Sequence, residues 1–436
     1  MDNFVISFQE FFIIFLLIIA IFLPFNLLSK NKLTIAHPLI FYSLVMFYYT
    51  ILCPIYQIVN NETISKGFDF REQYILGWQG ALLSVVSVLI GYFLNNKVNK
   101  KASKYCFLNY ESLWSIGLAL NIIGFFLFML FTGFDISVLN PFYSQSLSLN
   151  FLTYKGGFRN FFLTSQDFLI SGNLLMFASA YSTQKKFPIT LLTILISTCI
   201  FLNSGFRYRL LILFASIIIF LLLKEDKLKA SLAINLGSAA LVILLISMTI
   251  IGQIRTYGQG INLEYLDLTD NILKNTFAQA ESSIFITTSG IINIIPKVLP
   301  FENFYPIFKT LIHPLPAAFF DKGSGDYLYK ISDAVYGFKN VWHGAAYLYY
   351  GEYYLMFGWF GIFIFNFLIG NLFKRLWSWI NIHKEEPLAL LIYILNIVFI
   401  FMVITRGYLP QQVMLYLFIM APVFAVYFYN LRRITN

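Results

Sequence analysis

Residues 11–28 of the chain read FFIIFLLIIAIFLPFNLL, an apolar run that contains one polar residue, Asn26, and no charged side chain. A helix needs about 20 apolar residues to cross the roughly 30 Å hydrocarbon core of a bilayer. This run approaches that length, no basic residue precedes it, and it lacks the A-x-A cleavage site of a signal peptide. We therefore predict that residues 11–28 form a retained membrane span.

The same apolar character continues through the whole chain. Of its 436 residues, 58% are hydrophobic and only 12% are charged, against roughly 25% charged in an average soluble domain. Lipid offers no partners for exposed backbone N–H and C=O groups, which favours helices as membrane-spanning elements. Because the runs are apolar on every side, they do not fit the alternating strands of a membrane barrel. The composition predicts an all-α, polytopic integral membrane protein.

We predict about eleven transmembrane helices in a single membrane domain that covers residues 1–436. No internal repeat and no flexible linker divides the chain. The span at 161–181 is the least regular, because Asp167 and two polar clusters interrupt it. The predicted spans are 11–28, 39–58, 74–94, 113–132, 161–181, 187–202, 209–223, 231–254, 345–373, 387–405 and 412–429.

Loop charge predicts the orientation, because short cytoplasmic loops collect lysine and arginine. The odd-numbered loops and the C-terminal tail hold sixteen of the 30 basic residues and only five acidic ones. We therefore expect the N-terminus outside the cytoplasm and the C-terminus inside it. The net charge of +9 then reflects topology, and it does not indicate a nucleic-acid partner.

The longest predicted loop covers residues 255–342, on the outer side, and loops of this length usually carry function or structure of their own. Leu263–Glu281 has the pattern of an amphipathic helix. Phe304–Phe320 is apolar but interrupted by prolines, which predicts a segment along the interface or dipping into the outer leaflet. The polar turn Gly323–Tyr327 follows it. Such an apolar platform with a polar mouth suits a substrate that is half lipid and half sugar.

Two histidines, His313 and His343, fall in this loop, and the unperturbed imidazole pKa of about 6.5 suits general acid–base chemistry. His343 lies where the loop enters the ninth span, whereas His313 lies beside prolines in an apolar stretch. A structural role is the alternative for each, more strongly for His313. Glu352 follows His343 by nine positions, on the opposite face of a continuous helix, which favours a packing or helix-pairing role.

Arginines lie at the outer helix ends, and the planar guanidinium group is well suited to bind phosphate. Arg207 and Arg209 flank Tyr208 in a tight turn between the sixth and seventh spans. Arg255 ends the eighth span and Arg406 ends the tenth. We predict that these arginines are candidate ligands for phosphate or another anion. The alternative is that they are interfacial anchors, with Tyr208 in an aromatic belt.

Several familiar reaction signatures are absent from the sequence. It contains no Walker A motif, no HExxH metal motif and no GxSxG nucleophile elbow. Acidic residues are scarce in the middle of the predicted spans, which disfavours a secondary transporter. The sequence therefore predicts no metal and no cofactor.

Four short motifs resemble the signature of the bacterial O-antigen polymerase and ligase superfamily, which contains Wzy-type polymerases and WaaL-type ligases. They are GSG at 323–325, WHGAA at 342–346, GE at 351–352 and FGWFG at 357–361. The SGFR turn at 204–207 is similar to the turn that opens a span in that family. The number of spans and the large loop before the last helices also fit.

This resemblance implies a GT-C-like glycosyltransferase architecture and metal-independent glycosyl transfer at the periplasmic face of the inner membrane. The implied donor is an undecaprenyl-diphosphate-linked saccharide, embedded in membrane lipid, and a separate protein regulates chain length. The family histidine matches His343, as base on the acceptor hydroxyl. The family arginines match Arg207, with Arg209 and Arg255, as ligands of the diphosphate.

The WHGA sequence at 342–345 favours a polymerase over a ligase, because ligases often show a His-x-His-Asn run there. The expected function is polymerisation of oligosaccharide repeat units of O-antigen or a related polysaccharide. Two alternatives stay open. One is an O-antigen ligase that transfers polysaccharide to lipid A-core, and the other is a non-enzymatic transporter of lipid-linked sugar or polysaccharide.

Overall fold

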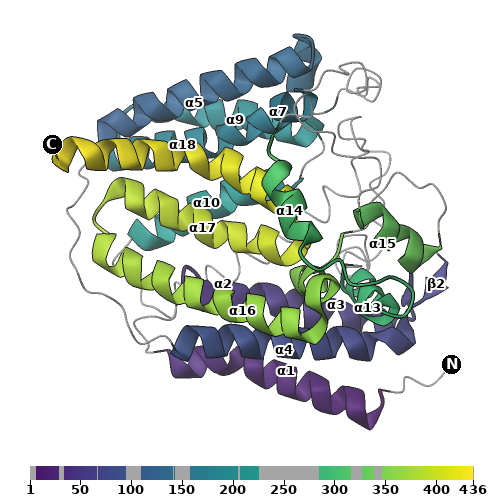
Figure 1. The fold of residues 1–436 in the computed structure, drawn as a ribbon. Helices are drawn as coiled ribbons and strands as arrows, with labels where there is room; N and C mark the ends of the chain where they lie inside the picture. The colour runs from purple at the N-terminus through teal and green to yellow at the C-terminus, as the bar shows by residue number, and fades with distance from the viewer. Residues whose placement is uncertain are drawn as a thin grey trace.

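The computed structural model describes residues 6–28, 34–65, 67–94, 110–140, 142, 158–204, 207–224, 284–315, 327–337 and 346–435. These residues form a bundle of long helices (Figure 1). Seven of the described helical segments are long and apolar enough to cross a membrane. The prediction of an all-α, polytopic membrane protein is thereby confirmed.

The seven segments coincide with predicted spans. They are α1 (Phe8–Leu27); α2 (Pro38–Phe47) continued by the π-helical η2 (Tyr48–Leu52) and α3 (Cys53–Val59); the 3₁₀ turn η3 (Arg71–Gln73) with α4 (Tyr74–Leu94); α5 (Tyr110–Phe131); α16 (Tyr349–His383); α17 (Pro387–Thr405); and α18 (Leu409–Thr435).

Three further helices coincide with the predicted fifth to seventh spans and are shorter. They are α8 (Phe168–Thr183), α9 (Phe187–Ser204) and α10 (Arg207–Lys224). The irregular span predicted at 161–181 is a broken element, because α7 (Arg159–Thr164) and the 3₁₀ turn η5 (Ser165–Asp167) precede α8. The span predicted at 231–254 lies outside the described residues, so the count of eleven stays a prediction.

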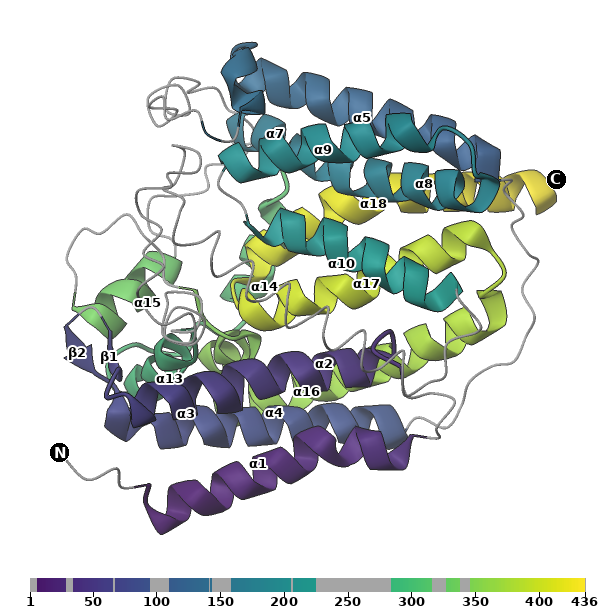
Figure 2. The same cartoon turned by 180° about the vertical axis from the view of Figure 1, so that it is seen from behind.

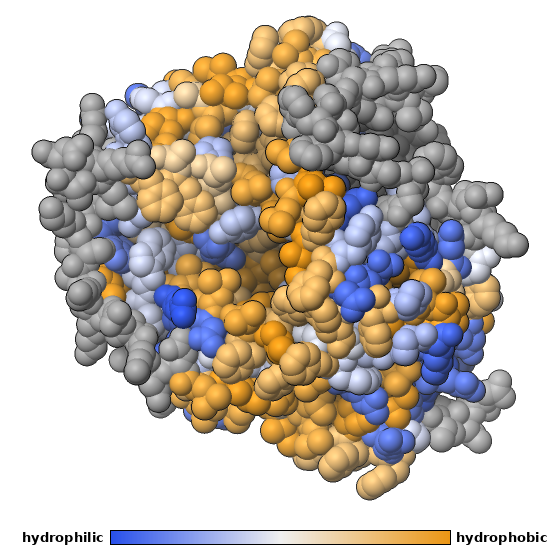
Figure 3. Space-filling model, viewed as in Figure 1, coloured by the Kyte–Doolittle hydropathy of each residue, from blue (hydrophilic) through white to orange (hydrophobic). Residues whose placement is uncertain are grey.

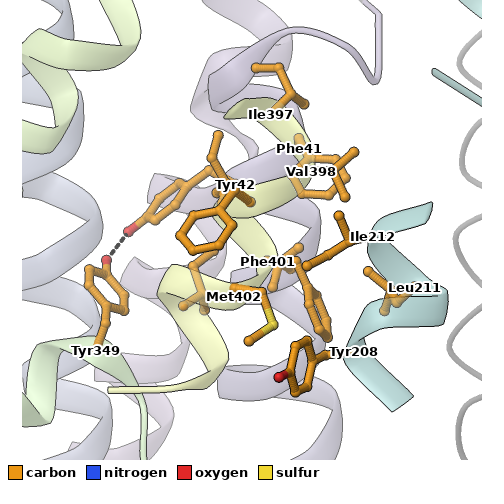
Figure 4. Packing of buried hydrophobic residues seen from close by; sticks show 14 of the residues in the cluster. Phe41, Tyr42, Tyr208, Leu211, Ile212, Tyr349, Ile397, Val398, Phe401 and Met402 are labelled. Atoms are coloured by element: carbon orange, nitrogen blue, oxygen red, sulfur yellow. Dashed lines mark hydrogen bonds between the residues drawn. The ribbon is translucent and has the colours of Figure 1, made fainter. Parts of the chain in front are cut away.

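Helix α17 is the central element of the bundle. It packs against α2, α8, α10, α16 and α18, and Figure 2 shows α10 beside it. The helix carries no charged residue, and nearly all of its residues are buried. A helix that is apolar on all sides belongs in such an interior position. Figure 4 shows side chains of α2 and α10 meeting Ile397, Val398, Phe401 and Met402 of α17.

Small residues allow two helix pairs to approach closely. Between α4 and α16, Gly91 lies against the backbone of Phe367, and Gly370 lies against the backbone of Val88. Between α5 and α8, Gly117 lies against the Gly172 carbonyl. A Cβ atom at any of these glycines would collide with the neighbouring backbone. Close backbone approach of this kind is a common way to pack helices in lipid, where burial alone does not drive helices together.

Most of the short elements between the long helices lie at one end of the bundle. The antiparallel pair β1 (Ile64–Ser65) and β2 (Phe68–Asp69) lies there, and we call it the hairpin end (Figure 1). The C-terminus lies at the opposite end. The short turn η4 (Ile136–Leu139) is the remaining described element outside the predicted loop.

The predicted loop at 255–342 supplies three helices at the hairpin end: α13 (Ile284–Ile294), α14 (Tyr305–Ile312) and α15 (Tyr327–Tyr336). Helix α13 was not predicted. It is apolar and mostly buried, and it packs on α4 and α16, with Phe285 and Ser289 against Gly77. The amphipathic helix predicted at Leu263–Glu281 lies outside the described residues.

Helix α16 is broken near its beginning. Phe357 and Gly358 leave the helical conformation, and Gly358 has φ 64° and ψ −148°, a region open essentially to glycine. The break separates a buried first part, Tyr349–Met356, from the longer part that ends at His383. The structure also moves the boundaries, because the span predicted at 345–373 begins later and continues further.

A buried ion pair links the interrupted fifth span to α10. Arg209 Nε donates to Asp167 Oδ1 at 2.5 Å, and the two side chains are 1% and 0% exposed. Arg209 also lies over the ring of Tyr208, 5.1 Å from the ring centroid. Each charge is therefore compensated inside the protein, as a buried charge requires.

We expect Asp167→Asn to lower the free energy of unfolding by about 3–5 kcal/mol, because it leaves the Arg209 charge buried without a countercharge. The matched control is Glu111→Gln, which removes the exposed pair with Lys185 and should leave stability close to wild type. Unfolding of the purified protein in detergent, followed by tryptophan fluorescence, measures both. Equal effects of the two substitutions would show that the buried pair does not stabilise the bundle.

Candidate functional site

A buried carboxyl group lies at the hairpin end, in the first turn of α16. Glu352 is fully buried, and it accepts hydrogen bonds from the hydroxyls of Tyr327 and Tyr347. The backbone N–H of Leu409, at the beginning of α18, lies 3.4 Å from the same side chain. The beginning of a helix also favours negative charge through the helix dipole. Glu352 thus connects α15, α16 and α18 through one acceptor.

The donor from α15 stays protonated. Burial and the negative charge of Glu352 raise the pKa of Tyr327 well above its usual value, because both disfavour a phenolate. The Tyr327 hydroxyl therefore stays protonated throughout the neutral range and remains a hydrogen-bond donor to Glu352.

Aromatic rings extend this arrangement toward α14. The rings of Tyr327 and Tyr408 lie 5.3 Å apart, and the ring of His313 meets that of Tyr408 edge-on at 6.0 Å. We call His313, Tyr327, Tyr347, Glu352 and Tyr408 the Glu352 cluster. It brings together residues from α15, the start of α16, the end of α14 and the turn between α17 and α18.

The turn between α17 and α18 is fixed to the cluster through its backbone. Gly407 N donates to Tyr347 O at 2.7 Å, and a Cβ at position 407 would collide with the Tyr347 ring. Gln412 donates to the carbonyls of Arg406 and Val403. The backbone of Arg406, one of the predicted anion ligands, therefore lies directly beside the cluster.

Helix α14 runs across the ends of the long helices at this side (Figure 1). It is amphipathic: Phe308 and Leu311 are exposed, whereas Lys309 is buried on the inner side. Tyr305, Lys309 and His313 follow each other at intervals of four and so share one face. The ring of Tyr305 lies 6.0 Å from that of Tyr327. This face places the buried Lys309 next to the cluster, to which His313 itself belongs.

Two predicted residues lie inside the bundle rather than in an open turn. Arg209 is paired with Asp167, and Tyr208 is buried against α17, beside Phe401 in Figure 4. The belt position suggested for Tyr208 is wrong, because its ring fills the core. Both arginines belong to α10, which begins at Arg207. Arg209 points inward because it lies on the buried face of this helix.

Three predicted residues cannot be placed in this geometry. The side chain of Arg207 is outside the described part of the chain, although its backbone begins α10. Arg255 and His343 lie outside the described residues altogether. The argument that Glu352 and His343 face opposite ways also fails, because α16 begins at Tyr349, after His343.

Several residues of the site were missed in the sequence. Tyr327, Tyr347 and Tyr408 are hidden among 28 tyrosines, and nothing in their local sequence marks them as neighbours. Lys309 carried a usable signal, because it is the only basic residue between Phe304 and Phe320. Within the ranges that the structure describes, no three His, Cys, Asp or Glu side chains gather closely enough to hold a metal ion.

The comparisons with known proteins match the chain to a protein family. A family model described as O-antigen polysaccharide polymerase Wzy matches residues 3–434. No curated protein and no solved structure matches the chain.

Replacing Tyr327 by phenylalanine should lower the free energy of unfolding by about 1.5–3 kcal/mol, because the lost hydrogen bond goes to a charged acceptor. The matched control is Tyr336→Phe in the same helix, whose hydroxyl pairs with the neutral hydroxyl of Thr287 at 2.6 Å. That change should cost about 0.5–1.5 kcal/mol. Thermal unfolding of the purified variants measures the difference, and a larger loss for Tyr336→Phe would contradict a charged Glu352.

Proposed function

Because the chain belongs to the family of O-antigen polysaccharide polymerases called Wzy, we propose that it joins undecaprenyl-diphosphate-linked repeat units at the periplasmic face of the inner membrane. The growing glycan leaves its diphosphate carrier and is transferred to a hydroxyl of the next lipid-linked unit. The match over residues 3–434 is the observation that carries this proposal. A chain-length regulator protein is the proposed partner.

The hairpin end supports the proposal by its chemistry. Its Glu352 cluster offers buried polar groups, and α14 exposes apolar side chains beside them. Helices long enough to cross a membrane also have one of their ends at the hairpin end. A substrate with a sugar part in water and a chain in lipid needs such a boundary. In the proposed orientation the hairpin end faces the periplasm.

His343 is the proposed base on the acceptor hydroxyl. It precedes Tyr347 by four positions, and Tyr347 is bound to both Glu352 and Gly407. The cluster thus fixes the chain at Tyr347, four positions after the histidine. A neutral imidazole accepts the hydroxyl proton as the new glycosidic bond forms, and the bond to the diphosphate breaks.

Arginines are the proposed ligands of the diphosphate leaving group, because fixed cations stabilise the charge that develops on it. Arg207 and Arg255 carry this role by the family resemblance, and Arg406 and Lys309 add cations at the hairpin end. Arg209 has a supporting role in this proposal, because its pairing with Asp167 holds the first turn of α10. The start of that helix carries Arg207.

We expect His343→Ala to lower the polymerisation rate by about 10²–10⁴-fold. Arg207→Ala should lower it by about 10²–10³-fold, as the loss of one charge-stabilising contact does. The measurement is the polysaccharide ladder from a deletion strain that expresses each variant at wild-type level. The matched control is His37→Ala, a histidine bound to Tyr92 elsewhere in the bundle. Full-length polymer from His343→Ala would contradict the assignment of the base.

The proposed base also predicts a pH dependence. The imidazole acts only when neutral, so activity should fall as acid protonates it, in the range of about pH 6.5 where free histidine titrates. Initial rates with purified protein and lipid-linked repeat units, measured from pH 5 to pH 8, give the profile. A rate that stays constant across this range would contradict an imidazole base.

The same strain separates the polymerase from its alternatives. Loss of a polymerase leaves lipopolysaccharide capped with a single repeat unit, whereas loss of a ligase leaves bare core. Polymer formed by the purified protein in detergent would exclude a role restricted to transport.

A further inference from the structure

A hollow of about 220 Å³ lies between α16, α17 and α18. Each of the three helices turns one face toward it, with residues at helical spacing. Figure 3 shows a recess among hydrophobic side chains near the centre of this face of the molecule. On α17 the lining runs from Asn396 to Ile404, which corresponds to about 12 Å of helix.

The hollow is chemically suited to hydrocarbon. Most of its lining is aliphatic or phenylalanine, and its polar side chains are bonded within the protein. The hydroxyls of Tyr42 and Tyr349 are hydrogen-bonded to each other at 2.7 Å. The Tyr416 hydroxyl donates to Asn396 Oδ1 at 2.9 Å. The fifth polar residue, Gln412, donates to backbone carbonyls. A sugar would need partners that these groups already have, whereas an apolar chain would need none.

The hollow opens sideways toward the surroundings of the helices. Leu372 lines it and is 60% exposed, and Leu368, one turn earlier in α16, is also exposed. The three helices that form it are all long and apolar enough to cross a membrane. A chain can therefore enter from the bilayer without passing through water.

The hollow is linked to the Glu352 cluster by hydrogen bonds of the turn between α17 and α18. Gln412 lines the hollow and binds the carbonyl of Arg406, next to Gly407, which donates to Tyr347. Tyr349, another lining residue, follows Tyr347 by two positions. A chain held in the hollow would thus carry its head group toward the turn that contains Arg406.

We propose that this hollow holds the polyprenyl chain of the lipid-linked donor, an inference that rests on the proposed function. The chain gains little from burial, because it leaves one hydrocarbon environment for another. Its role is orientation: it fixes the reactive sugar–phosphate bond beside the cluster, and such positioning accelerates reaction.

Leu372→Trp tests this role, because the larger side chain fills the hollow from its exposed rim. For an undecaprenyl donor we expect kcat/KM to fall about tenfold, the low end of what an apolar pocket contributes to discrimination. For a geranyl analogue of the same donor, kcat/KM should not change. The control is Leu368→Trp, an equivalent substitution that is exposed but does not line the hollow. Unchanged kcat/KM for the undecaprenyl donor in Leu372→Trp would overturn the proposal.

A binding measurement separates this proposal from the proposed function. A photoreactive undecaprenyl diphosphate should crosslink to residues 369–376 and 399–404 in the wild-type protein, and less in Leu372→Trp. Unlabelled undecaprenyl phosphate should compete, and phosphatidylethanolamine should not. Equal competition by the phospholipid would assign the hollow to bulk lipid and overturn the proposal. Selective crosslinking by a protein that forms no polymer would support the hollow and contradict the polymerase assignment.

Discussion

The buried carboxyl group of Glu352 is the constraint on which the hairpin end depends. A carboxylate that is fully buried requires donors, and this one obtains them from Tyr327, Tyr347 and the start of α18. These donors belong to three elements that are distant in sequence. Satisfying the hydrogen bonds of one carboxyl group therefore fixes three segments relative to each other. The same carboxylate lies in the first turn of α16, where the helix dipole also favours it.

The break in α16 makes this position available. With Gly358 in a conformation that other residues rarely adopt, the helix is kinked there, and its first part, Tyr349–Met356, is buried. Its Tyr350 then reaches the Gly77 carbonyl of α4, and its Tyr354 reaches the Ile295 carbonyl after α13. The apolar helix α13 fills the remaining space beside α4, so the site rests on packed helices.

The sequence predicts those features that depend on one helix alone. The span at 387–405 was predicted with its observed bounds, because α17 is apolar throughout and lies between Pro387 and Arg406. Helix α13 was missed because eleven residues are too few to cross a bilayer. The partners of Glu352 could not be found, because Tyr327 and Leu409 lie 25 and 57 positions away. Local periodicity carries no information about such contacts. The pairing of Arg209 with Asp167 was hidden for the same reason.

In the proposed arrangement, the hollow restrains the chain of the lipid-linked donor, and the residues at the hairpin end restrain its head group. A lipid-linked saccharide is mobile in two dimensions, and its reactive bond lies at the boundary between hydrocarbon and water. Polar contacts at the head group alone would leave the carrier free to tilt, because a flexible chain in lipid transmits little restraint. Apolar contacts alone would leave the head group free to rotate. Gln412 and Tyr349 line the hollow, and the turn at Arg406 and the residue pair Tyr347–Gly407 lie next to them. Restraint on the chain and restraint on the head group can thus act on the same bond, which a membrane enzyme needs in order to convert binding into orientation.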